Sequence, residues 1–214
     1  VRSVVMPFER QAKEVYVGDE FSLPPADNYL PVYDRYTTRE RRAKGLPQTY
    51  GAKRSYFYGD HVAYLTFDDG PGGESTEALL DGLKERGIKA SFFLIGRNIP
   101  GKEELVKRMD EEGHLIGSHT YDHVDLTGCS VEEALEEIEG SAAAISKITG
   151  KPVRYIRPPF GSWSRSLEEA SDMTRVGWTV DSEDWKGGEA ARIAERVLKT
   201  VRDGDIILFH DVYG

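Results

Sequence analysis

Short apolar runs alternate with amphipathic segments along the chain from about residue 56 onward. The short runs are rich in β-branched and aromatic residues and are bounded by glycine or polar turns, which predicts strands. The predicted strands are Val62–Phe67, Ala90–Ile95, Leu115–Gly117, Tyr155–Ile156, Val176–Val180 and Asp205–Phe209. Between them, helical spacing of apolar residues predicts helices at Thr76–Arg86, Lys102–Glu112, Val131–Thr149 and Ala190–Arg202. This alternation predicts an α/β fold, with a mostly parallel sheet or barrel and helices outside it.

The segment Val131–Thr149 has the most complete helix signature. Ser130 and Glu133 have the spacing of a capping box, and Gly150 is a typical residue just past a helix end. Its apolar stripe consists of Leu135, Ile138, Ala142, Ile145 and Ile148. We therefore expect an amphipathic helix that packs one face on the sheet.

Residues 1–55 have a different composition. Prolines at positions 24, 25, 31 and 47, scattered aromatic residues and a basic run interrupt any helical period. We expect residues 1–55 to form an irregular N-terminal extension or linker and residues 56–214 to form one domain. The total of 214 residues suits one sizeable core plus such an extension.

The formal net charge is −9 at pH 7. An acidic chain is a poor match for nucleic acid or an anionic membrane surface, so a neutral or cationic substrate fits better. No apolar run approaches the length needed to span a membrane. Cys129 is the single cysteine, so an intrachain disulfide is excluded, which is compatible with either redox compartment.

Polar residues follow the predicted strands at the points where those strands end. Asp68 and Asp69 follow one strand, and His119, Arg157, the acidic stretch 181–184 and His210 follow others. The carboxyl ends of parallel strands form the functional face of α/β proteins, so we expect these side chains to meet on one rim. Two adjacent carboxylates repel each other, which calls for a cation, an arginine or a catalytic role.

The stretch HTYDH places His119 and His123 four residues apart. On a helical turn this spacing would bring both rings to one ion. Two imidazoles and one carboxylate leave coordination positions open, as a hydrolytic zinc site requires. The same ligand set also occurs in non-haem iron oxygenases, although a neighbouring base and a proton-donor histidine have no evident use there.

Three further stretches carry candidate chemistry. In RPPFG, Arg157 could hold a carboxylate in a bidentate pair and keep it ionised; the alternative is a surface arginine beside a turn. In DSEDW, Trp185 suits stacking on a sugar ring, whereas a core tryptophan is the plainer alternative. In ILFHD, His210 could donate a proton near neutral pH or be a structural histidine. We expect His114 to brace the loop behind His119.

Taken together, TFDDG, HTYDH, RPPFG, DSEDW and LFH closely resemble the five motifs of the polysaccharide deacetylases, the NodB-homology or carbohydrate esterase family four. The resemblance covers about residues 60–214 and is greatest to the peptidoglycan N-acetylglucosamine deacetylases. It implies a distorted (β/α) barrel and a divalent metal, usually Zn²⁺, with Co²⁺ or another divalent ion as the alternative. Family members usually continue past the last histidine with a further helix and strand, so we expect this domain to lack them.

The resemblance also implies roles for individual residues. Asp69, His119 and His123 would be the metal ligands. Asp68 would be the general base and Arg157 would orient it. His210 would protonate the leaving amine and Asp184 would pair with it, Trp185 and Leu208 would wall the acetyl pocket, and the backbone N–H of Phe160 would help to hold the oxyanion.

The function implied is metal-dependent hydrolysis of acetamide groups on N-acetylglucosamine residues of peptidoglycan or chitin-like oligosaccharides, with release of acetate. A glycan is thus the expected partner, without nucleic acid or membrane contact. The alternatives are an O-acetyl esterase acting on acetylxylan and a catalytically silent carbohydrate-binding domain; retention of Asp68 and His210 counts against the silent domain. The substrate class implies a bacterial extracellular or cell-surface location.

Overall fold

The computed structural model describes residues 63–202 and 204–213. Its strands are β1 Ala63–Asp68, β2 Ser91–Leu94, β3 Leu115–Ser118, β4 Tyr155–Ile156, β5 Thr174–Arg175, β6 Val180–Asp181 and β7 Asp205–His210. Its α-helices are α3 Glu74–Glu85, α4 Glu103–Glu111, α5 Val131–Thr149, α6 Arg165–Ala170 and α7 Ala190–Thr200. Short 3₁₀ turns lie at Gly96–Asn98, Leu126–Gly128, Pro159–Gly161 and Asp184–Lys186. The predicted extension, residues 1–55, lies outside the described residues.

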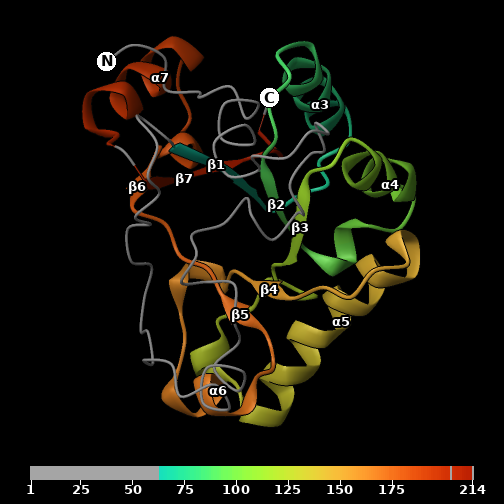
Figure 1. Cartoon of the computed structure of the whole chain (residues 1–214). Helices are drawn as coiled ribbons and strands as arrows, with labels where there is room; N and C mark the ends of the chain where they lie inside the picture. The colour runs from blue at the N-terminus through green and yellow to red at the C-terminus, as the bar shows by residue number, and fades with distance from the viewer. Residues whose placement is uncertain (1–62, 203, 214) are drawn as a thin grey trace, which may run out of the picture.

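The strands form one sheet in the order β5-β4-β3-β2-β1-β7-β6, and every neighbouring pair is parallel. The sheet curls, with α3, α4 and α5 along its outer side (Figure 1). The architecture is a distorted (β/α) half-barrel, which confirms the predicted fold class. No helix in the described ranges is long and apolar enough to cross a membrane.

Strand β1 lies at the centre of the polar rim. It pairs with β7 over six positions, from Ala63 opposite Asp205 to Asp68 opposite His210. On its other side it pairs with β2, where Asp68 lies opposite Phe93. This register places the last residues of β1 and β7 side by side at one end of the sheet.

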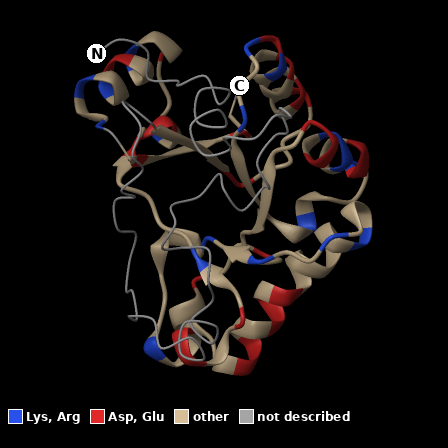
Figure 2. Ribbon diagram, in the orientation of Figure 1, with Lys and Arg blue, Asp and Glu red and all other residues tan. Residues whose placement is uncertain are grey.

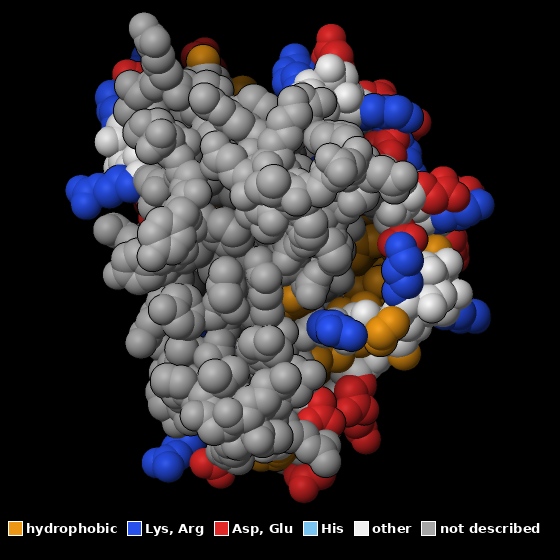
Figure 3. Space-filling model, in the orientation of Figure 1, with side chains coloured by type: hydrophobic (Ala, Val, Ile, Leu, Met, Phe, Trp, Pro, Cys, Tyr) orange, Lys and Arg blue, Asp and Glu red, His pale blue; other side chains and the backbone are white. Residues whose placement is uncertain are grey.

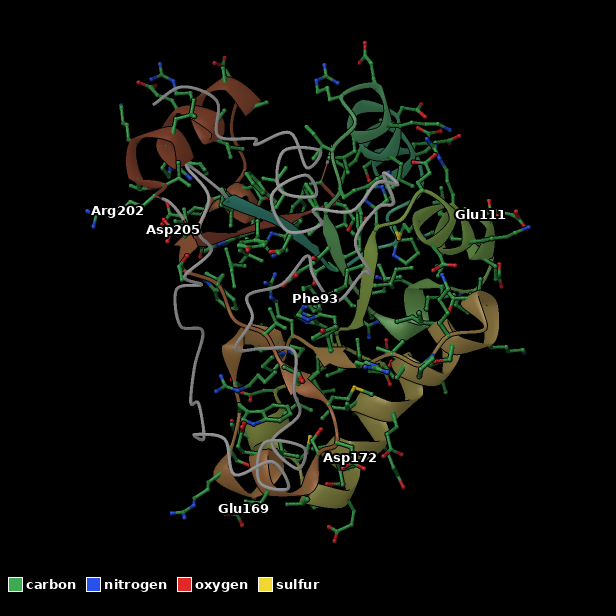
Figure 4. The ribbon with its side chains drawn as sticks, viewed as in Figure 1. Phe93, Glu111, Glu169, Asp172, Arg202 and Asp205 are labelled. Carbon is green, nitrogen blue, oxygen red and sulfur yellow. The ribbon has the colours of Figure 1, made fainter. Side chains whose placement is uncertain are left out.

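Side chains alternate between the two faces of the curled sheet, as strand geometry requires. Phe92 points outward into a large cluster between the sheet and α3, α4 and α5. Phe93 points inward and packs with Leu115, Tyr155 and Val176, near the middle of the curl (Figure 4). The interior of the half-barrel is therefore a packed core rather than a channel.

Helix α5 begins and ends where the sequence predicts. The side chain of Ser130 accepts a hydrogen bond from the N–H of Glu133, the Glu133 carboxylate accepts one from the N–H of Ser130, and Gly150 ends the helix with φ 69°. Acidic residues colour much of the outer surface of this helix (Figure 2). The buried face carries Ile138 and Ile145, as the predicted stripe requires.

A pocket of about 410 Å³ opens at the opposite end of the sheet from the polar rim. It is lined by the first residues of β3 and β4, Leu115 and Tyr155, and by residues at the ends of α4 and α5. In the view of Figure 3, hydrophobic side chains gather on the right-hand part of the described surface, with Lys and Arg side chains beside them. His114 lines the pocket and accepts a hydrogen bond from the N–H of Ala90, so it does not brace the loop behind His119 as expected.

The predicted strand Val176–Val180 is wrong except at Val180, which begins β6. Residues 176–179 join β5 to β6, which are the two opposite edges of the sheet. The N–H of Val176 donates to the carbonyl oxygen of Ile156 in β4, and the N–H of Thr179 donates to that of Ile206 in β7. The segment therefore crosses the interior of the curl from one edge of the sheet to the other. Val176 is buried inside the curl and Trp178 packs partly buried against Tyr64 and Ile206, whereas Thr179 is exposed. The short helix α6 was not predicted, because its six residues bury only Leu167 and so show no helical period of apolar residues.

Candidate metal centre and active site

Three side chains converge beyond the ends of β1 and β3. Oδ1 of Asp69 lies 3.3 Å from Nε2 of His119 and 3.3 Å from Nε2 of His123. One ligand atom from each residue lies within 4.8 Å of the others. Oδ1 of Asp69 is buried and has no hydrogen-bond partner among the described residues. A buried carboxylate oxygen facing two imidazoles is the donor set of a divalent metal site, so these residues fit the ion that the sequence predicts.

The tautomer of His119 suits metal ligation. Its Nδ1 lies 2.6 Å from the backbone carbonyl oxygen of Arg157, so Nδ1 carries the proton and donates it to that oxygen. The lone pair of Nε2 then points toward Asp69, as a neutral imidazole ligand requires. Burial and the neighbouring His119 lower the pKa of His123, against the opposing charges of Asp69 and Asp68. Burial alone would raise the pKa of Asp69, but the contact with His119 and the charges of His119, His123 and His210 lower it.

The HTYDH stretch is not a helical turn, contrary to the prediction. Thr120 and His123 adopt positive φ values of 66° and 59°, a conformation that costs energy for residues other than glycine. Surrounding contacts hold it. Oε2 of Glu137 accepts hydrogen bonds from the N–H groups of Tyr121 and Asp122 at 3.0 and 2.8 Å, and Oγ1 of Thr120 accepts one from the N–H of His123 at 3.0 Å. The rings therefore converge through a strained loop rather than through helical spacing.

Asp68 and Arg157 form a buried ion pair inside the curl. Nη1 of Arg157 donates to Oδ1 of Asp68 at 2.8 Å and to Oγ1 of Thr66 at 2.6 Å, while Nη2 donates to the carbonyl oxygen of Gly177 at 2.9 Å. The pair is thus not bidentate, and Arg157 is fully buried rather than a surface residue. Burial lowers the pKa of the Arg157 guanidinium, and Asp68 opposes this shift. Oδ2 of Asp68 faces the metal cluster, 3.8 Å from Nε2 of His119.

A second charged pair, His210 with Asp184, lies at the end of the neighbouring strand β7. Nδ1 of His210 lies 2.7 Å from Oδ1 of Asp184, and the backbone N–H of His210 donates to Oδ2 of Asp184 at 2.7 Å. Burial lowers the pKa of His210, but the hydrogen bond and charge of Asp184, with the charges of Asp68 and Asp69, outweigh it and raise the pKa overall. His210 is thereby favoured as an imidazolium.

The remaining predicted residues surround these groups. Phe160 has φ 59° inside the Pro159–Gly161 turn, and its exposed ring lies 5.0 Å from that of His123. Trp185 is half exposed on the turn that carries Asp184. Leu208 is buried two residues before His210, on the same face of β7.

Several residues that support the site were given no role by the sequence analysis. Thr66 lies two residues before Asp68 and so shares its strand face, which is a usable signal. Glu137 lies on the polar side of α5, and its spacing from HTYDH gives no indication of contact. Asp211, the residue after His210, is buried beneath the turn that follows Asp69.

Comparison with known proteins gives one family. The model of the polysaccharide deacetylase family matches residues 58–177. Peptidoglycan-N-acetylglucosamine deacetylase PgdA of Listeria monocytogenes is 40% identical over 149 residues, which are 70% of this chain and 32% of that protein. The chain therefore spans about a third of the length of that curated relative.

Two further similarities extend the comparison. Peptidoglycan-N-acetylglucosamine deacetylase of Bacillus cereus is 36% identical over 208 residues, covering 93% of this chain and 75% of the relative. The solved structure of peptidoglycan deacetylase PdaC from Bacillus subtilis superposes with a TM-score of 0.69 at 39% identity. The superposition covers 71% of this chain and 75% of the PdaC chain.

Proposed function

Because the chain belongs to the polysaccharide deacetylase family, we propose that it hydrolyses the acetamide of N-acetylglucosamine residues in peptidoglycan or chitin-like oligosaccharides and releases acetate. The observation that carries the proposal is the arrangement of one rim. This rim holds a two-histidine, one-carboxylate cluster, a carboxylate held by a buried arginine and a histidine held by a second carboxylate. Amide hydrolysis needs those three elements: an electrophile, a base and an acid.

Asp69, His119 and His123 would hold the divalent ion, with Zn²⁺ as the proposed metal and Co²⁺ or another divalent ion as the alternative. When bound, such an ion polarises the acetamide carbonyl and acidifies a water molecule. Two features of the site suit such an ion. The lone pair of His119 Nε2 is free, and Oδ1 of Asp69 is buried without a competing hydrogen bond among the described residues.

Asp68 is the proposed base. Its Oδ1 is occupied by Arg157, whereas its Oδ2 faces the cluster and is available to take the proton of the attacking water. Three hydrogen bonds from Arg157, to Asp68, Thr66 and Gly177, fix the guanidinium. Its position in turn fixes the carboxylate. We therefore assign Arg157 to orienting Asp68 rather than to contacting substrate.

His210 is the proposed acid. Its Nδ1 donates to Asp184, so its Nε2 is the nitrogen that can deliver a proton to the leaving amine. An amine leaves poorly without that proton. Base and acid lie at the paired ends of neighbouring strands β1 and β7, so one group can accept a proton while the other gives one.

Three residues would shape the substrate pocket. The backbone N–H of Phe160 is the proposed second donor to the oxyanion that develops on the carbonyl oxygen. Trp185 and Leu208 are the proposed walls around the acetyl methyl. From the glycan substrate we also propose a bacterial extracellular or cell-surface location.

The test is acetate release from an N-acetylglucosamine oligomer by protein stripped with a chelator and then resupplied with Zn²⁺. We expect release to return with the metal and to be lost in Asp68→Asn. Asp122→Asn is the matched control, because it neutralises an exposed carboxylate between the two ligand histidines that pairs only loosely with Arg97, at 3.6 Å. Release from acetylxylan but not from the oligomer would replace the proposal with an O-acetyl esterase. Glycan binding without release from either substrate would indicate a binding domain.

A further inference from the structure

Asp211 is a buried carboxylic acid that the proposed reaction does not use. It directly follows His210, and only 3% of its surface is exposed. Its side chain points back under the turn that joins β1 to α3, the turn that starts with Asp69. It thus lies behind the site, out of reach of a glycan that binds at the rim.

Asp211 is attached through its side chain and its backbone to the two elements that flank that turn, the end of β1 and the start of α3. Oδ2 accepts a hydrogen bond from Oγ1 of Thr76 at 2.5 Å, and its carbonyl oxygen accepts one from Oγ of Ser75 at 2.6 Å. Its N–H donates to the carbonyl oxygen of Asp68 at 3.3 Å. The same Thr76 hydroxyl accepts a hydrogen bond from the N–H of Gly72 at 2.6 Å, which extends the chain of contacts across the turn.

The turn is shaped around this carboxyl group. A Cβ on Gly70 would lie 2.4 Å from both carboxylate oxygens of Asp211, and a Cβ on Gly72 would lie 2.5 Å from its carbonyl oxygen. Either approach is far inside van der Waals contact, so only glycine fits. The residue just before Gly70 is Asp69, whose φ is 74°, a strained value that persists only where neighbouring groups hold it.

Retaining a carboxyl group at this place costs stability. Burial, with the charges of Asp68 and Asp69, raises the pKa of Asp211 to about 7 against the hydrogen bond from Thr76. Its Oδ1 has no hydrogen-bond partner among the described residues. An apolar side chain of similar volume would avoid that cost, which favours a role in geometry over a role in stability.

We propose that Asp211 is a positioning residue that locks the end of β7, which carries His210, to the turn of β1 that carries Asp69. Strand pairing between β1 and β7 ends at Asp68 and His210, so beyond that point the contacts of Asp211 set the spacing of metal ligand and acid. This inference rests on the function proposed above, because the spacing matters only if Asp69 binds metal and His210 donates a proton.

The experiment compares Asp211→Ala and Asp211→Asn with Asp205→Ala. Asp205 is the matched control, because it is as buried as Asp211 and accepts a hydrogen bond from a threonine hydroxyl, that of Thr179. It is the first residue of β7, at the far end from Asp211, and lies beside Arg202 (Figure 4). Each variant is examined by the visible spectrum of bound Co²⁺, by Co²⁺ affinity in competition with a chelator, by kcat and KM for acetate release, and by thermal unfolding of the metal-free chain.

We expect Asp211→Ala to change the Co²⁺ spectrum, to weaken Co²⁺ binding about tenfold and to lower kcat by about 10- to 100-fold at nearly constant KM. Asp211→Asn keeps the shape and an oxygen that accepts from Thr76, so it should restore the spectrum and most of kcat. Asp205→Ala should lower the unfolding temperature while the spectrum and kcat stay those of the wild type.

An Asp211→Ala protein that loses stability but keeps the wild-type spectrum and kcat would show that the carboxyl is merely structural. If that variant does not fold by circular dichroism, Thr76→Val removes the hydroxyl at similar volume, and the same spectral change is expected. A wild-type chain that binds no Co²⁺ would overturn both the proposed function and the role of Asp211. A wild-type chain that binds Co²⁺ but releases no acetate would overturn only the proposed reaction, and the Co²⁺ spectra of the variants would then decide the role of Asp211.

Discussion

The carboxylate of Asp184 contacts His210 twice, once at the imidazole Nδ1 and once at the backbone N–H, both at 2.7 Å. The two residues come from different elements, the Asp184–Lys186 turn and the last position of β7. The backbone contact fixes where the carboxylate lies, and the imidazole contact fixes which ring nitrogen faces the site. Burial raises the pKa of Asp184, but its hydrogen bonds and the charge of His210 lower it overall, so the pair is ionic.

Asp184→Asn is expected to lower the pKa of His210. The aspartate favours the imidazolium, so its loss means that His210 gives up its proton at a lower pH. If protonated His210 is the acid, the alkaline limb of the kcat profile moves to lower pH, and kcat at neutral pH falls roughly 10- to 100-fold. The measurement is kcat against pH, with the imidazole followed by NMR.

Glu183→Gln is the control for that change. Glu183 is the preceding residue and pairs with Lys186 and Arg196 at 2.7 and 3.4 Å, away from His210. The alkaline limb of the kcat profile of Glu183→Gln should match that of the wild type. An alkaline limb that stays in place in Asp184→Asn would remove His210 from the role of acid.

Arg157→Met tests the buried ion pair. The substitution leaves Asp68 buried without its cation, and breaking such a pair costs about 3–5 kcal/mol. We expect the free energy of unfolding of the metal-free chain to fall by about that amount in urea titrations. Arg165→Met, at an exposed arginine whose nearest acid is 3.5 Å away, should change it by less than about 1 kcal/mol. Equal stability of both variants would mean that water reaches Asp68 in solution.

Much of this fold follows from local patterns in the sequence. Helix α5 has a cap at each end and a buried stripe, and strands such as β4 and β7 are short apolar runs with polar ends. These signals depend on neighbours in the chain, so they survive without tertiary information. The strand ends also place Asp68, Arg157 and His210 on one rim, because parallel strands share the direction of their carboxyl ends.

Other features depend on contacts that are distant in the sequence. Val176 and Trp178 pack within the curl on a segment that crosses it, and the hydrophobic period alone does not distinguish such a segment from a strand. His119 and His123 meet through positive φ at Thr120 and His123, held by Glu137 from α5. The choice of Asp184 over Asp181 as the partner of His210 also depends on how the turn after β6 is folded.

His114 should make stability depend on pH away from the site. Burial, with the charge of Lys89, lowers its pKa to about 4, whereas an unfolded chain protonates near the usual value of 6.5. As pH falls from 6.5 to 4, the unfolded state therefore binds the proton first and the folded state loses on the order of 3 kcal/mol. In His114→Asn, the amide oxygen can still accept from Ala90 while the titration is gone. Urea midpoints of the metal-free chain across this range should then fall less steeply than those of the wild type, and parallel curves would contradict the assignment.

Phe160 separates the role of a backbone group from that of a side chain. Its φ of 59° favours glycine, and its ring is 69% exposed beside His123. Phe160→Gly keeps the N–H and relieves the strain, so kcat should stay within about threefold of the wild type and the free energy of unfolding within about 1 kcal/mol. Phe160→Ala removes the same ring but keeps the strained Cβ, so it should be the less stable of the two. If both variants raise KM equally at wild-type kcat, the ring contacts the glycan and the N–H supports the reaction. A kcat that falls about 100-fold in both would assign the catalytic contribution to the ring instead of the oxyanion contact.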